Sequence, residues 1–152
     1  MRTRPSITVA AVIERGGRFL LVEEEDGGRI LFNQPAGHLE ARESLAQGCT
    51  REVLEESAWH FRPRALVGIY RWSKPERAAG TETSYLRFAF CGELGTHEPE
   101  RKLDTGIVRA LWMDMDEIRA TSARHRSPLV LRCTEDYLAG RRYALDLLTD
   151  HA

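Results

Sequence analysis

Three glutamates that lie close together in the sequence could bind a metal ion. Glu52, Glu55 and Glu56 fall in a segment rich in strong helix formers. In a helix of about 100° per residue, Glu55 lies about 60° to one side of Glu52 and Glu56 about 40° to the other. The three carboxylates share one face, where they repel each other and a cation would be bound. Oxygen ligands without a histidine or cysteine cluster suit Mg²⁺, for which Mn²⁺ can substitute, better than Zn²⁺.

Three further residues extend this pattern: Gly37, Glu43 and Arg51. Arg51 can bond a carboxylate through two nitrogens, and Glu43, near the start of the helix, is its natural partner. Alone, an acidic helix face is usually only solvated, and an isolated Glu43–Arg51 pair would be a surface ion pair. At residue frequencies of about 6%, however, six identities at fixed offsets coincide on the order of once in a hundred thousand chains. The spacing therefore indicates a metal site.

Gly48 lies one turn before Glu52 on the same stripe of the helix. Glycine costs a helix about 1 kcal/mol relative to alanine, so its presence there calls for a reason. Two readings stay open. The missing side chain could leave room for ions, water and phosphate, or a backbone segment or aromatic ring could pack against the helix.

Alternating apolar and β-branched segments between turn signals predict the elements that position these residues. Strands are predicted over residues 7–13, 19–22, 30–32, 66–72, 85–94 and 108–113, with a loop at 33–37 and a polar loop at 74–83. Helices are predicted over 45–57, 114–120 and 127–139, the last with Ser127 as its cap, Pro128 in its first position and Gly140 as its stop. This order predicts one α+β domain spanning residues 1–152.

Composition narrows the range of partners. The chain has 22 basic and 23 acidic residues, so no broad positive field is available for nucleic acid or an anionic membrane. No signal peptide or membrane span is evident. Cys49, Cys91 and Cys133 are an odd number at wide spacings, which matches neither a disulfide framework nor a zinc motif. A reducing, cytoplasmic setting is expected.

The box Gly37-x5-Glu43-x7-Arg51-Glu52-Val53-x-Glu55-Glu56 resembles the Nudix motif, G-x5-E-x7-R-E-U-x-E-E-x-G-U. The resemblance implies an α/β/α sandwich with a mixed sheet, in which a loop-helix-loop segment binds divalent metal. It assigns the three glutamates to the metal, adds the Gly37 carbonyl as a further ligand, and pairs Glu43 with Arg51. Residues 33–40, 86–88 and 126–130 are also similar to the NudJ-type branch, phosphatases acting on nucleotides and thiamine-related pyrophosphates.

One position departs from the Nudix motif. Ala58 and Trp59 stand where the family has a glycine and a bulky aliphatic residue. The glycine normally ends the helix in the left-handed conformation, which costs an alanine about 1 kcal/mol. Ala58 is therefore expected either to accept this strain or to end the helix in another way.

Six residues outside the box are candidates for substrate contact: Phe32, His38, Trp72, Tyr85, Arg87 and Asp104. The three aromatic rings could stack on a base or pyrimidine, or belong to the core. His38 could bond a phosphate or simply hydrogen-bond at the surface. Arg87 could neutralise a distal phosphate or pair with an acid at the sheet surface. Asp104 could assist metal or water, or bond its own backbone in a turn.

Together these features predict a magnesium-dependent enzyme that hydrolyses phosphoanhydride bonds in nucleoside di- or triphosphates or thiamine-related pyrophosphates. Water is the expected nucleophile, and the general base stays open. We expect a small-molecule partner and a monomer or small homo-oligomer. The alternative is a Nudix-fold module that binds a nucleotide or RNA without turnover, because a fold does not fix its function.

Overall fold

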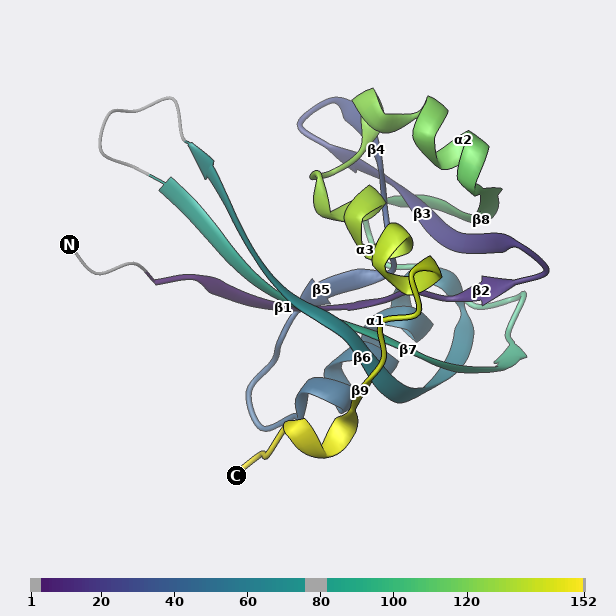
Figure 1. The fold of residues 1–152 in the computed structure, drawn as a ribbon. Coiled ribbons are helices and arrows are strands. Elements are labelled where there is room, and N and C mark those ends of the chain that lie inside the picture. Colours follow the sequence, from purple (N-terminus) through teal and green to yellow (C-terminus); the bar gives the residue numbers. More distant parts are fainter. Residues whose placement is uncertain (1–3, 76–81, 152) are drawn as a thin grey trace.

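The computed structural model describes residues 4–75 and 82–151, and within them two sheets form the centre of the fold (Figure 1). The first has the order β5 (Ala36–His38), β1 (Ser6–Ala11), β7 (Glu82–His97), β6 (Trp59–Pro75) and β9 (Tyr143–Ala144). The second contains β2 (Glu14–Arg15), β3 (Arg18–Asp26) and β4 (Arg29–Asn33), with β8 (Ile107–Asp114) paired to β3. The β1–β7 pair is parallel and the other named pairs are antiparallel, so the predicted mixed sheet is confirmed.

Helices cover both sides of the strands. Helix α1 (Leu45–Ser57) packs Cys49 and Val53 into one apolar cluster with residues of β1, β6 and β7. Helices α2 (Met115–Ala120) and α3 (Leu129–Leu138) contribute Ile118 and Cys133 to a second cluster. Two short 3-10 helices, η1 (Ser122–Arg124) and η2 (Leu145–Leu147), complete the named elements. Two apolar clusters with helices on different sides give the expected α/β/α sandwich.

Helix α1 has defined ends. At its start, the Ser44 hydroxyl accepts a hydrogen bond from Gln47 N at 3.1 Å, and the Gln47 side chain accepts one from Ser44 N at 2.8 Å. This capping box satisfies backbone donors that the first turn leaves free. At its end, Ala58 has φ 63° and ψ 17°, so the left-handed conformation is confirmed for an alanine. The helix thus accepts a strain that the usual glycine avoids.

The prediction of a loop over residues 33–37 is wrong at both ends. Strand β4 continues to Asn33, and β5 begins at Ala36. Residues of β5 pair antiparallel with β1, with Val9 opposite Gly37. This pairing with a distant strand cannot be read from the local sequence, and it fixes the position of the box loop beside the central sheet.

Other boundaries also shift. The strands predicted over 66–72 and 85–94 are parts of a longer hairpin, β6 and β7, whose pairing reaches Lys74 and Thr83. Of the predicted polar loop at 74–83, residues 76–81 lie outside the described residues. Helix α3 begins at Leu129, so Pro128 holds the N-cap position that was predicted for Ser127. The Ser127 hydroxyl, one residue earlier, still accepts a hydrogen bond from Leu129 N at 3.1 Å.

The three cysteines are buried and carry free thiols. Among residues 4–75 and 82–151, no helix combines the length and the apolar character that a membrane span requires.

Candidate active site

Arg51 connects the box loop to the acidic face of α1. Its Nε and Nη2 atoms donate to the two carboxylate oxygens of Glu43 at 3.0 and 2.7 Å. Its Nη1 donates to Glu52 Oε1 at 2.7 Å and Glu55 Oε2 at 3.1 Å, and Nη2 also donates to the His38 carbonyl. The expected Glu43–Arg51 pair is present. Hydrogen bonding from Arg51 lowers the pKa of Glu43, which keeps this loop carboxylate ionised.

Glu52 and Glu56 are buried carboxylates at the same end of the pocket. Burial raises the pKa of Glu56 to about 9, although its Oε1 accepts a hydrogen bond from Ala36 N at 2.9 Å. Burial also raises the pKa of Glu52 to about 7, against the opposing effect of Arg51. Both groups are held where the charged form is poorly solvated. A nearby cation would favour that form.

The ligand atoms available on this face of α1 are carboxylate oxygens, which hard divalent cations prefer. A bound cation would also balance the negative charge of the ionised carboxylates. In the conformation described for residues 4–75 and 82–151, no three His, Cys, Asp or Glu side chains are arranged to hold a metal. Arg51 Nη1 contacts both Glu52 and Glu55, and the Glu55 side chain is 31% exposed. A cation at this face would thus compete with Arg51, and Glu55 has room to turn toward it.

Two glycines allow close approach of the loop to α1. A Cβ atom at Gly37 would overlap the Glu52 carboxylate, so an alanine there would force the Glu52 side chain to move. A Cβ atom at Gly48 would lie 2.8 Å from Glu43 Oε1 and 3.2 Å from Leu39 Cδ1. The nearest atoms at Gly48 thus belong to the loop side chains of Glu43 and Leu39, which neither reading named.

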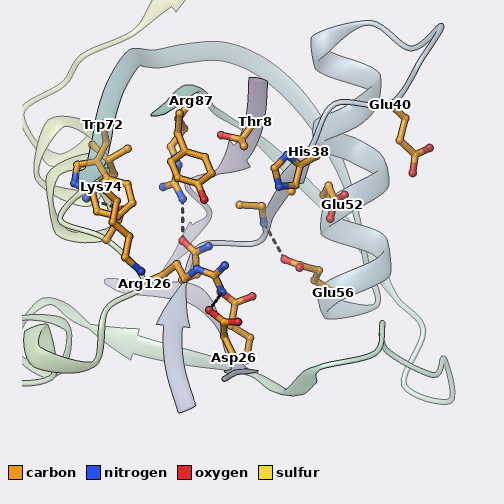
Figure 2. Close-up of a pocket in the computed structure, with 17 residues that line it drawn as sticks. Thr8, Asp26, His38, Glu40, Glu52, Glu56, Trp72, Lys74, Arg87 and Arg126 are labelled. Carbon is orange, nitrogen blue, oxygen red and sulfur yellow. Dashed lines mark hydrogen bonds and ion pairs between the residues drawn. The ribbon is translucent and has the colours of Figure 1, made fainter. Parts of the chain in front are cut away.

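A cavity of about 470 Å³ lies beside the acidic face of α1 (Figure 2). Glu52, Glu56, His38 and Glu40 occupy one end, and Trp72 and Lys74 the opposite end, with Arg87 and Arg126 between them. The lining also includes Thr8, Glu24, Asp26, Asn33, Ala36, Gly37, Tyr85, Ser127 and Leu129. Carboxylates at one end and an aromatic and cationic region at the other provide separate surfaces for a charged and a cyclic part of one ligand.

The aromatic wall comes from paired strands. Trp72 of β6 lies opposite Tyr85 of β7, and their rings stack with centroids 5.7 Å apart and an interplanar angle of 19°. Arg87 follows on the same face of β7, because alternate strand residues point to one side. It donates to Gln34 and Asn33 side-chain oxygens, so the reading that it pairs with an acid at the sheet surface is wrong.

Of the remaining candidates, one lines the pocket and two do not. His38 is exposed and lines the pocket. Phe32 is only 4% exposed and belongs to the core, where the Arg124 guanidinium lies 4.5 Å from its ring, so its predicted substrate contact is not supported. Asp104 is exposed outside the lining, and its backbone N–H donates to the Glu55 carbonyl at 2.9 Å. Its charge is among the causes that raise the pKa of Glu52, after burial and the charge of Glu55.

Several lining residues were not identified as candidates from the sequence: Glu24, Asp26, Asn33, Lys74 and Arg126. Gln34, which accepts a hydrogen bond from Arg87, was also missed. Asn33, Gln34 and Arg126 fall in the short segments that resemble the NudJ-type branch. This resemblance could have identified them as candidates. Lys74 and the two acids carry no such mark, since only the pairing of distant strands brings them to the pocket.

Comparison with known proteins agrees with this geometry. A model of the NUDIX domain matches residues 2–133. The chain is 38% identical over 147 residues to the Phosphatase NudJ of Escherichia coli strain K12, covering 97% of this chain and 92% of that protein. A solved NUDIX hydrolase from Nitrosomonas europaea is 55% identical with a TM-score of 0.90, covering 97% and 98% of the two chains. The MutT protein from Methanosarcina mazei shares the fold at 22% identity, with a TM-score of 0.69 over 93% and 99% of the chains. The protein is therefore a hydrolase that belongs to the Nudix family.

Proposed function

We propose that this hydrolase cleaves a phosphoanhydride bond of a compact organic diphosphate or triphosphate, with Mg²⁺ as its physiological cation. The observation that carries the proposal is the pair of buried carboxylates, Glu52 and Glu56, at one end of a pocket whose other end is aromatic and cationic. Glu55 and the Gly37 carbonyl complete the proposed metal ligands. When bound, Mg²⁺ would neutralise phosphate oxygens and acidify the attacking water, and Mn²⁺ would substitute for it.

The chain's own residues account for the rest of the site. Arg51 orients Glu43 of the loop and Glu52 and Glu55 of the helix, through the four side-chain hydrogen bonds described above. A carboxylate must accept a proton from the attacking water, and Glu52, Glu55, Glu56 or Asp104 could do so. The intact carboxylate set gives no support to the alternative of a binding module without turnover.

The pocket supports small substrates. A cavity of about 470 Å³ with one aromatic wall suits one ring and two or three phosphates better than a long dinucleoside polyphosphate. Trp72 or Tyr85 supplies the stacking face, His38 a hydrogen bond, and Arg87 a positive charge. The proposed class includes nucleotides and thiamine-related pyrophosphates, such as thiamine diphosphate and its pyrimidine precursor, because of the motif resemblance described under the sequence analysis. The three buried thiols support a reducing, cytoplasmic setting.

Phosphate release from a substrate panel tests the proposal. We expect Glu52→Gln and Glu56→Gln each to lower turnover at least about a hundredfold while preserving the fold, because each removes charge but little volume. Glu135→Gln, an exposed carboxylate of α3, is the control and should retain activity. Near-normal turnover in both box variants, or full activity after exhaustive chelation, would refute the metal assignment.

The same panel tests the substrate class. The ratio kcat/KM should be higher for nucleoside di- and triphosphates and thiamine diphosphate than for sugar nucleotides and diadenosine polyphosphates. A preference of about tenfold or more for the last two classes would contradict the proposed substrates and leave the metal-dependent hydrolysis standing.

A further inference from the structure

A buried cation that has no ion pair with a described side chain lies between the two ends of the pocket. Arg87 is 6% exposed, and it forms no ion pair with any side chain that the structure describes. Its Nη1 donates to Gln34 Oε1 at 2.8 Å and makes a longer contact of 3.8 Å with Cys133 Sγ, while Nη2 donates to Asn33 Oδ1 at 2.9 Å. These acceptors are neutral. The positive charge is therefore hydrogen-bonded but not neutralised, which is costly in a buried position.

Arg126, the neighbouring arginine of the pocket, differs in this respect. Its Nη1 lies 3.2 Å from Glu24 Oε1 and 3.5 Å from Asp26 Oδ2, and its side chain is 40% exposed. Burial raises the pKa of Glu24, and Arg126 opposes this shift more strongly than Arg87 does. Glu24 is thus the partner of Arg126. Arg126 is paired with acids of the protein, whereas Arg87 acts on Glu24 only more weakly and forms no ion pair with a described side chain.

Two amides hold the Arg87 guanidinium in a fixed orientation. Gln34 is 1% exposed, and its Nε2 donates to the Val130 carbonyl of α3 at 2.7 Å, which directs its Oε1 toward Arg87. Asn33 ends β4 and accepts from the other terminal nitrogen. A guanidinium has five N–H donors, so these contacts do not saturate it. A side chain already held in place loses little conformational freedom when it binds a ligand.

We propose that Arg87, positioned by Asn33 and Gln34, forms an anion subsite that binds one phosphate group of the substrate and also binds inorganic phosphate alone. The planar guanidinium matches phosphate oxygens, and Figure 2 shows Arg87 directed into the pocket between the carboxylate end and the aromatic end. The inference rests on the proposed function in assigning that phosphate to the substrate. Binding of inorganic phosphate needs neither turnover nor a divalent cation.

Thermal unfolding in EDTA, with inorganic phosphate added against sodium chloride of equal ionic strength, tests the subsite. We expect phosphate to raise the Tm of the wild type saturably. Arg87→Gln should weaken this response at least about tenfold, while its Tm without phosphate stays equal or rises, because a buried uncompensated charge is removed. Arg126→Gln, the matched control, should keep the phosphate response.

A second variant tests the positioning role without removing Arg87. Gln34→Glu places a carboxylate against the guanidinium, so it should weaken the phosphate response and raise KM for a diphosphate at least about tenfold, with kcat nearly unchanged. An Arg87→Gln variant with lowered Tm and an intact phosphate response would show that Arg87 is only structural, and would overturn the inference. A lost response in Arg126→Gln alone would also overturn it. Phosphate binding through Arg87 with no turnover of any substrate would instead refute the proposed function.

Discussion

Replacing Glu56 with glutamine should make the metal-free protein more stable than the wild type as the pH rises. Glu56 is 7% exposed, and burial, reinforced by the charge of Glu52, raises the pKa of its carboxyl from 4.5 to about 9. Between these values the folded protein keeps a proton that the unfolded chain has released. The contribution of Glu56 to stability is therefore complete below about pH 4.5 and is lost as the pH rises toward 9.

The size of this loss follows from the linkage relation. Each pH unit in that interval costs about 1.4 kcal/mol, so the difference between pH 5 and pH 8 is at most about 4 kcal/mol. Typical domains have a free energy of unfolding of about 5–15 kcal/mol, so the change is readily measured. Glutamine preserves the volume and an oxygen that can accept from Ala36 N, now 2.9 Å from Glu56 Oε1. The raised pKa values of Glu52 and Glu24 occur in both the wild type and the Glu56→Gln variant. Their effects therefore largely cancel in the difference between the two free energies of unfolding.

Urea denaturation in EDTA at several pH values measures the effect. We expect the unfolding free energies of Glu56→Gln and wild type to agree near pH 5 and to diverge by a few kcal/mol in favour of the variant by pH 8. Glu135→Gln should show no such divergence. At pH 8, Mg²⁺ should stabilise the wild type much more than Glu56→Gln. Parallel pH curves for Glu56→Gln and wild type would refute the reasoning about the buried carboxylate.

Three further changes test the loop and the ends of α1. Gly37→Ala should lower the free energy of unfolding by about 1–3 kcal/mol and reduce turnover, because the new Cβ overlaps the Glu52 carboxylate. Urea denaturation and phosphate release would measure the two effects, and wild-type values for both would show that the loop moves freely. Arg51→Lys removes the bidentate contact with Glu43, so turnover or Mg²⁺ affinity should fall about 10–100-fold in a metal titration. A change below twofold would contradict the positioning role of Arg51. Ala58→Gly relieves about 1 kcal/mol of left-handed strain but removes a buried methyl group worth about 0.8 kcal/mol, so urea denaturation should show no change or a gain below about 1 kcal/mol. A clear loss of stability would mean that packing outweighs strain.

Local patterns were sufficient to predict α1 and the helix face that its glutamates share, although no three described carboxylates are gathered around one point. Helical geometry alone places Glu52, Glu55 and Glu56 on one face, whatever the rest of the chain does. The capping residues Ser44 and Gln47 lie within the same short segment, so the start of the helix is also a local property. For a single helix, the spacing of residues in the sequence determines which of their side chains lie close together.

Contacts between distant segments could not be predicted in this way. Strand β5 exists because Gly37 and its neighbours pair with β1, and their own residue types do not indicate a strand. Gly48 faces the Glu43 carboxylate only because the loop folds back over the helix. Phe32, an aromatic residue on a short strand, could equally have faced the pocket or the core. The outcomes for β5 and Phe32 depend on strand register and the outcome for Gly48 on the path of the loop, and a single sequence leaves both undetermined.

The charges of the pocket support the proposed ligand more strongly when they are considered together. At one end, burial raises the pKa values of the Glu52 and Glu56 carboxyls, so a cation there would favour their charged forms. In the middle, Arg87 is a buried cation that none of the described carboxylates neutralises. These two groups cannot neutralise each other, because Asn33 and Gln34 hold Arg87 and because Ala36 N and Arg51 hold the glutamates. A metal ion alone would satisfy the first, and a free phosphate alone the second. A divalent cation complexed to a di- or triphosphate supplies both charges in one ligand, which is the physical basis for preferring that substrate class.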